Sequence, residues 1–280
     1  MYRRFVSCYE SWLEGQKSDL TDLLHVSRTP GASQMQLRLI IDQCLQNYAS
    51  YMEQRRSLAR EDGPTYFCPP WCTSFENSVL WMGGCRPSLI IRLLYSLTGH
   101  EMEAHLDEYL QGLRTATNVG LMALSARQLQ QVNDLHQRTL RAEDRLTSQL
   151  ATLHEDVADK PLLPIVKERQ RTDSASTSSA AAAVAVAASS SSSSLQHLSD
   201  GHTGFAAGGN GEAAAALQTY ADGLSKLVEE ADKLRMSTAR ALATEILNPS
   251  QAVEMLIVAK QLHLSVHTWG LERDRQHGRE

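Results

Sequence analysis

A seam of residues runs without a break from residue 217 to residue 241 and limits the folds that the chain can adopt. Its members alternate between spacings of three and four positions, which is the period of an α-helix packed against other helices. They are Leu217, Tyr220, Leu224, Leu227, Ala231, Leu234, Thr238 and Ala241. Because the last members are small or polar, we expect this helix to pack within a bundle and not to form a long free coiled coil.

The other apolar segments also follow helical spacing, and we expect helices over residues 5–15, 35–59, 87–99, 125–157 and 249–269. No strand-like alternation bounded by turn residues occurs in the sequence. The predicted class is therefore all-α, a multi-helix bundle. Glycine stops a helix readily, so three glycines are expected to end helices: Gly15, Gly99 and Gly270. The expected N-caps are Ser125, with Gln128 three positions later, and Asn248, with Pro249 and Gln251 behind it.

Residues 173–214 differ from the rest of the chain because they consist mainly of Ser, Ala and Gly. Such a composition buries too little apolar area to offset the entropy of ordering it, so we expect a disordered low-complexity insertion. The predicted organisation is a helical N-terminal part over 1–172, this insertion, the C-terminal helices of the same domain over 215–270, and a charged tail over 271–280.

Charge and composition exclude several classes of protein. The net charge is −5 and the pI about 6.1, so no overall basic field favours direct binding of nucleic acid. The longest apolar runs are shorter than the roughly 20 residues that a membrane-spanning helix needs, and the N-terminus lacks the apolar core of a signal peptide. We therefore expect an intracellular soluble protein.

The five cysteines do not indicate a disulfide framework or a zinc site. An odd number of cysteines in a reducing compartment favours free thiols. Cys68 and Cys72 flank the tripeptide PPW and Cys85 follows, but neither a fourth ligand nor a second closely spaced pair is evident. We expect buried free thiols and no structural zinc.

No catalytic motif is present in the sequence, which favours a non-enzymatic protein. The run HLSVH places His263 and His267 four positions apart on one helical face, but it lacks the glutamate of a metalloprotease HExxH motif. The sequence shows no third ligand that would complete a zinc or copper site with this pair. The two imidazoles are either ligands for a bound group or side chains packed in the helical core.

Four segments resemble a known plant family, the Delay of Germination proteins that regulate seed dormancy. They are YFCPPWCTSFENSVLWMGGCRPSLIIRLLYSLTG (66–99), LHEDVAD (153–159), EADKLRMSTARAL (230–242) and QAVEMLIVAKQLHLSVHTWG (251–270). The same domain forms the C-terminal half of TGA-type bZIP transcription factors. Only four residues precede FVSCYESWLEG, with no basic region or zipper, so we expect the stand-alone domain without a major-groove reader.

The resemblance implies a regulator of dormancy and abscisic acid signalling that binds and restrains type 2C protein phosphatases in the nucleus, and also in the cytoplasm. Its phosphatase-contacting segment matches SCYESW, in which Tyr9 and Trp12 fit the family pattern while Ser7 replaces an acidic residue. Tyr9 and Trp12 either anchor the partner or pack on the bundle. The sequence does not distinguish a monomer from a homo-oligomer.

The resemblance further implies haem binding through His263 and His267. Because two imidazoles on one side of a helix cannot easily face each other across a porphyrin, either one ligates the iron while the other assists, or the two are used alternately or by two molecules. An alternative function is that of a transcription-associated partner of bZIP factors, with the seam at 217–241 as its docking surface.

Overall fold

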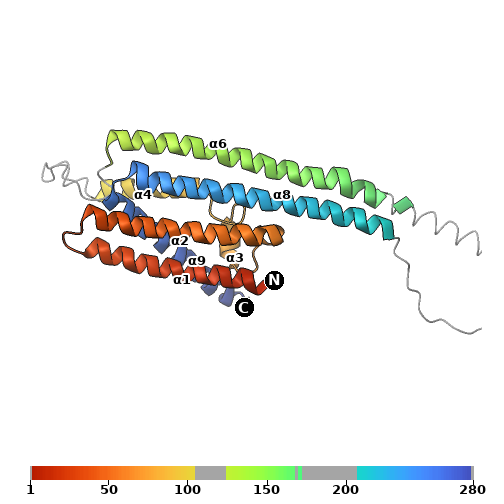
Figure 1. Ribbon diagram of the computed structural model, residues 1–280, viewed down its shortest axis with the longest axis horizontal. Helices are drawn as coiled ribbons and strands as arrows, with labels where there is room; N and C mark the ends of the chain where they lie inside the picture. Colours follow the sequence, from red (N-terminus) through yellow and green to blue (C-terminus); the bar gives the residue numbers. More distant parts are fainter. Residues whose placement is uncertain (1, 105–123, 168–169, 172–206, 279–280) are drawn as a thin grey trace, which may run out of the picture. The chain divides into compact units, whose positions relative to one another are not determined.

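The computed structural model describes residues 2–104, 124–167, 170–171 and 207–278, and within these ranges it is built from helices (Figure 1). The only strand-type pairing there is an isolated bridge between Trp81 and Gly84, so the predicted all-α class is confirmed. The helices are α1 (Tyr2–Arg28), α2 (Gln34–Glu61), the 3-10 turn η1 (Pro64–Tyr66), α3 (Ser74–Val79), α4 (Ser88–Ala104), α6 (Ala126–Val157), the π-helical turn η3 (Ala158–Leu162), α8 (Ala207–Arg240), the π-helical turn η4 (Ala241–Ile246) and α9 (Pro249–Gln276).

The described residues divide into two compact units, one drawn from the ranges 2–148 and 224–278 and the other from the range 149–223. In the first unit, α1, α2 and α9 pack against one another, and α3 packs on α9 (Figure 1). In the second unit, the end of α6 meets the start of α8 closely, since a Cβ built on Gly223 would lie 2.7 Å from a methyl carbon of Leu153. None of the described helices has the length and apolarity that crossing a bilayer requires.

Two clusters of buried side chains form the core of the first unit. The larger joins α1, α2, α4, α6, α8, η4 and α9, and it contains Leu23, Ile41, Ile91, Leu94, Val132, Leu242 and Met255. The smaller lies where α1 and α2 meet η1 and α8, and it contains Phe5, Cys8, Tyr51, Leu58, Ala59, Tyr66 and Val228. From Leu224 onward most of the predicted seam is buried, as bundle packing requires; the buried members are Leu224, Leu227, Ala231 and Thr238.

Three helices extend beyond the ends that were predicted for them at glycines. Gly15, Gly99 and Gly270 were expected to end helices, but each lies inside one. A glycine in a helix costs only about 1 kcal/mol relative to alanine, and the packing of both flanking segments outweighs that cost. None of these three glycines has a left-handed backbone, which is the conformation that a glycine at a helix end usually supplies.

Two boundaries of the predicted organisation therefore need correction. The segment 271–276 belongs to α9 and is not part of a separate tail. Within the predicted insertion, residues 207–214 belong to α8, while residues 173–206 lie outside the described residues. The first member of the predicted seam, Leu217, is 52% exposed. Apolar spacing alone does not say which members of a seam are buried.

Helix starts followed the expected capping chemistry. Ser125 and Gln128 form a reciprocal pair of side-chain to backbone hydrogen bonds, at 3.2 and 3.0 Å. Asn248 and Gln251 form the same pair, at 3.0 Å each. Each pair satisfies two backbone amides that a helix start would otherwise leave without a partner.

The segment WMGGC makes the tight connection between α3 and α4, with Met82 and Gly83 at positive φ. The Arg235 side chain on α8 holds this turn by donating hydrogen bonds to the backbone carbonyls of Trp81, Met82 and Cys85. Arg235 is itself paired with the buried carboxylate of Asp232. Gly83 is required because a Cβ there would lie 2.7 Å from the carbonyl oxygen of Tyr66.

Gly15 and Gly270 give a matched test of this packing. A Cβ on Gly15 would meet nothing within 4 Å, whereas a Cβ on Gly270 would lie 2.8 Å from the Cβ of Thr73. We expect Gly15→Ala to raise the free energy of unfolding by about 0.5–1 kcal/mol through helix propensity. We expect Gly270→Ala to lower it by roughly 1–2 kcal/mol, because overpacking outweighs the same gain. Urea unfolding of both variants measures this, and stabilisation by Gly270→Ala would contradict the close approach of α9 to Thr73.

Candidate functional site

The carboxylate of Glu76 lies where α1, α3 and the C-terminal half of α9 converge. Thr73 caps α3 in a capping box: its hydroxyl accepts from the Glu76 amide at 3.2 Å, and Glu76 Oε2 accepts from the Thr73 amide at 2.8 Å. The Thr73 hydroxyl also donates to Oε2 at 2.7 Å. The same carboxylate thus organises the start of α3 and remains able to accept further bonds through Oε1.

Side chains from two other helices complete the environment of Glu76. The Tyr9 hydroxyl on α1 donates to Oε1 at 2.5 Å, and Nδ1 of His267 on α9 lies 3.0 Å from the same oxygen. Glu76 is only 5% exposed. Burial raises the pKa of Glu76, but hydrogen bonds from Tyr9 and Thr73 outweigh burial, so the pKa is lowered overall. The side chain is therefore a buried carboxylate anion with donors from three helices.

The pKa of Tyr9 moves the opposite way. Burial raises it first, and the neighbouring Cys72 and the hydrogen bond to Glu76 raise it further. Tyr9 is 7% exposed, and its ring meets that of His267 edge to face at a centroid distance of 6.0 Å. Tyr9 thus stays protonated and serves as a hydrogen-bond donor to the carboxylate.

His263 lies one turn before His267 in an aromatic setting. Its ring meets that of Trp12 edge to face at 4.5 Å, and Trp12 stacks on Tyr51 at 4.5 Å with an interplanar angle of 13°. Burial lowers the pKa of His263 to about 4, so the ring is neutral at neutral pH. Nε2 of His263 and Nε1 of Trp12 are both buried without a hydrogen-bond partner.

Polar contacts on either side of the histidines fix α9. Before them, the buried ammonium of Lys260 donates to Gln16 at 2.9 Å and to Asp19 at 2.8 Å on α1. After them, Asp274 accepts a hydrogen bond from the Ser74 amide at 2.8 Å, at the start of α3. These contacts set the rotation of α9, which brings both imidazoles toward α1.

The structure brings all four predicted site residues together. Tyr9 and Trp12 approach His267 and His263, respectively, and all four side chains are buried or half-buried. Glu76 was not among the predicted site residues, although the run TSFE matches a capping-box pattern that could have revealed it. In the described part of the chain, no three His, Cys, Asp or Glu side chains form a group suited to a metal ion.

Comparisons with known proteins identify relatives of this chain. A family model described as seed dormancy control matches residues 17–96. Two Arabidopsis thaliana proteins match nearly the whole chain: Protein DOG1-like 3 is 33% identical over 96% of this chain and 84% of its own, and Protein DOG1-like 2 is 32% identical over 95% and 89%.

Two further relatives are less similar. Protein RESPONSE TO ABA AND SALT 1 from Arabidopsis thaliana is 25% identical over 83% of this chain and 77% of its own. Transcription factor TGA2.1 from Oryza sativa subsp. japonica is 28% identical over 54% of this chain and 38% of its own. Since the DOG1-like proteins match almost end to end and the family model covers the region around Glu76, this chain belongs to the DOG1 seed dormancy control family.

Proposed function

We propose that this protein is a non-enzymatic regulator of seed dormancy and abscisic acid signalling that acts in the nucleus by binding and restraining type 2C protein phosphatases. The observation that carries the proposal is the near full-length similarity to DOG1-like proteins. A relative named for its response to abscisic acid and salt supports the link to that hormone. The matches to TGA-type factors support a nuclear site of action.

The phosphatase-contacting segment, residues 7–12, has an inner and an outer face on α1. Tyr9 is buried against Glu76, and Trp12 is half-buried between Tyr51 and His263. Ser7, Glu10 and Ser11 are exposed on the same segment. Under this proposal Tyr9 and Trp12 hold the segment in place at its inner face, and the exposed residues touch the phosphatase.

The exposed face gives the sharper test, because Trp12→Ala would also remove the stacking on Tyr51 and so perturb folding. We expect Glu10→Lys to weaken binding to a type 2C phosphatase by about tenfold, which is about 1.4 kcal/mol, by reversing a charge within the contact. The matched control is Asp134→Lys, which reverses an exposed charge on α6. It should leave the affinity within about twofold.

Calorimetric titration of each full-length variant with the phosphatase measures these affinities, and thermal unfolding checks that both variants stay folded. Equal affinities of the Glu10 variant and the unchanged protein would remove this face of α1 from the interface. The phosphatase would then have to bind another surface of the protein.

Haem binding through His263 and His267 is a second property, and the surroundings of the two histidines favour it. The Nδ1 atom of His267 is held by Glu76, which is the kind of carboxylate partner that orients a metal-ligating histidine. The His267 side chain is 20% exposed. Nε2 of His263 is a buried nitrogen without a partner. Haem would supply an iron that accepts a neutral imidazole nitrogen. We assign His267 as the ligand and His263 as the assisting residue.

The haem proposal is tested by the Soret band of the purified protein mixed with haem. We expect a shift that His267→Ala abolishes, that His263→Ala weakens, and that the double variant lacks. His25→Ala, at an exposed position of α1, is the matched control and should leave the shift unchanged. An unchanged spectrum in the double variant would show that the histidine pair does not ligate haem.

The match to TGA2.1 favours an alternative function, transcriptional regulation together with TGA-type bZIP factors. The seam at 217–241 does not offer a docking surface for it, because the members from Leu224 onward are mostly buried. A partner would have to use other surfaces of the bundle. Pull-down from plant extract separates the two functions, since the first captures type 2C phosphatases and the second captures bZIP factors.

A further inference from the structure

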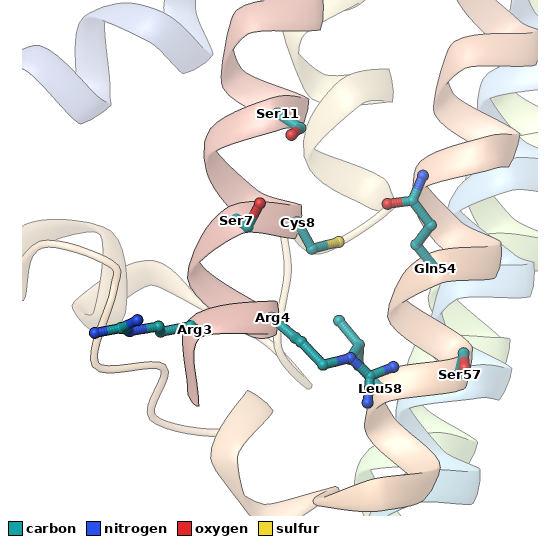
Figure 2. A pocket seen from close by; sticks show the side chains of 8 residues that line it. All are labelled: Arg3, Arg4, Ser7, Cys8, Ser11, Gln54, Ser57 and Leu58. Carbon is teal, nitrogen blue, oxygen red and sulfur yellow. The ribbon is translucent and has the colours of Figure 1, made fainter. Parts of the chain in front are cut away.

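A groove of about 420 Å³ lies between the N-terminal turns of α1 and the C-terminal half of α2 (Figure 2). Its volume falls within the roughly 300–1,000 Å³ that small-ligand sites occupy. The lining does not include Glu76 or either histidine, so the haem proposal does not use the groove, but Ser7 and Ser11 are shared with the segment proposed to touch the phosphatase. Its lining residues are Arg3, Arg4, Ser7, Cys8, Ser11, Gln54, Ser57 and Leu58.

The lining is rich in hydrogen-bond donors and carries positive charge. It contains two guanidinium groups, three hydroxyl groups and one carboxamide, and none of its eight residues is acidic. The remaining two are Leu58 and Cys8. Burial raises the pKa of the Cys8 thiol, so this side chain adds no negative charge at neutral pH. A ligand with several negatively charged oxygens would meet donors and no repelling carboxylate within the lining.

The two arginines differ in their position. In Figure 2, Arg4 reaches from α1 toward Ser57 and Leu58 on α2, whereas Arg3 extends from the other side of α1. Arg4 is therefore the cation that can touch a ligand in the groove, and Arg3 contributes through its longer-range field. The first turn of α1 contains no acidic residue, so the positive end of the helix dipole adds to this field.

The guanidinium of Arg4 already binds a carboxylate at the rim of the groove. Its Nη1 donates to both oxygens of Glu61, at 2.8 and 2.7 Å. The side chains are 61% and 30% exposed, so water screens this ion pair and it stabilises the fold little. A dianion with three acceptor oxygens can compete with the singly charged Glu61 for Arg4, because it also gains bonds from the hydroxyls of the groove.

We propose that this groove binds a phosphate monoester, with Arg4 as the charged contact and with Ser7, Ser11, Ser57 and Gln54 as neutral donors. The ester is carried either by a small metabolite or by a phosphoserine side chain of another protein, and the chemistry of recognition is the same. Glu61 occupies Arg4 in the absence of the ligand and so competes with it. This inference does not depend on phosphatase or haem binding.

The test is a titration of the full-length protein at low ionic strength with three probes: inorganic phosphate, a phosphoserine tripeptide and its unphosphorylated counterpart. We expect Arg4→Gln to weaken binding of the two phosphorylated probes by at least about tenfold, since a charged hydrogen-bond donor is lost. We expect Glu61→Gln to tighten binding severalfold, because it releases Arg4. Lys17→Gln removes a cation paired with Glu14 elsewhere on α1, and it should change affinity by less than about twofold.

The opposite signs for Arg4→Gln and Glu61→Gln keep the test decisive even if one variant loses stability, because damage to the fold cannot tighten binding. Similar affinity for phosphate and the phosphopeptide would support a small metabolite as the ligand. At least tenfold tighter binding of the phosphopeptide would support a phosphorylated partner. Equal weakening by Arg4→Gln and Lys17→Gln, or no tightening by Glu61→Gln, would overturn the proposal.

Discussion

The arrangement of the candidate site depends on one buried carboxylate, that of Glu76. Burying an ion costs several kcal/mol unless its hydrogen-bonding capacity is filled. Glu76 is filled by Tyr9 from α1, Thr73 at the start of α3, and His267 from α9. Loss of any one helix would leave this charge poorly satisfied, so the carboxylate ties the three helices to one geometry. The short helix α3 is positioned by its cap and by α9.

The polar partners of α9 follow a regular spacing that explains its orientation. Lys260, His267 and Asp274 lie seven positions apart, and successive members face the same side of a helix. Lys260 bonds to α1, His267 bonds to α3, and Asp274 accepts from the backbone at the start of α3. Gly270 lies between the last two and lets α9 approach Thr73. His263 follows Lys260 by three positions, and this register directs it toward Trp12.

The sequence predicted what depends on local chemistry and on apolar spacing. The helical class and the caps at Ser125 and Asn248 are confirmed, as is the burial of most of the seam from Leu224 onward. The prediction that helices end at Gly15 and Gly270 was wrong, because tertiary packing outweighs the small cost in helix propensity of a glycine. The pairing of Glu76 with Tyr9 and His267 could not be predicted, since apolar periodicity carries no information on which buried polar groups meet across helices far apart in sequence.

Glu76 couples α1 to the site through Tyr9, and a double-mutant cycle measures this coupling directly. The free energy of unfolding is determined in urea for Tyr9→Phe, Glu76→Gln and the double variant. If the buried carboxylate accepts a charged hydrogen bond from Tyr9, the two changes should be non-additive by about 1–2 kcal/mol, with the double variant less destabilised than the sum. Additivity within about 0.5 kcal/mol would show that Tyr9 and Glu76 are not coupled in this way.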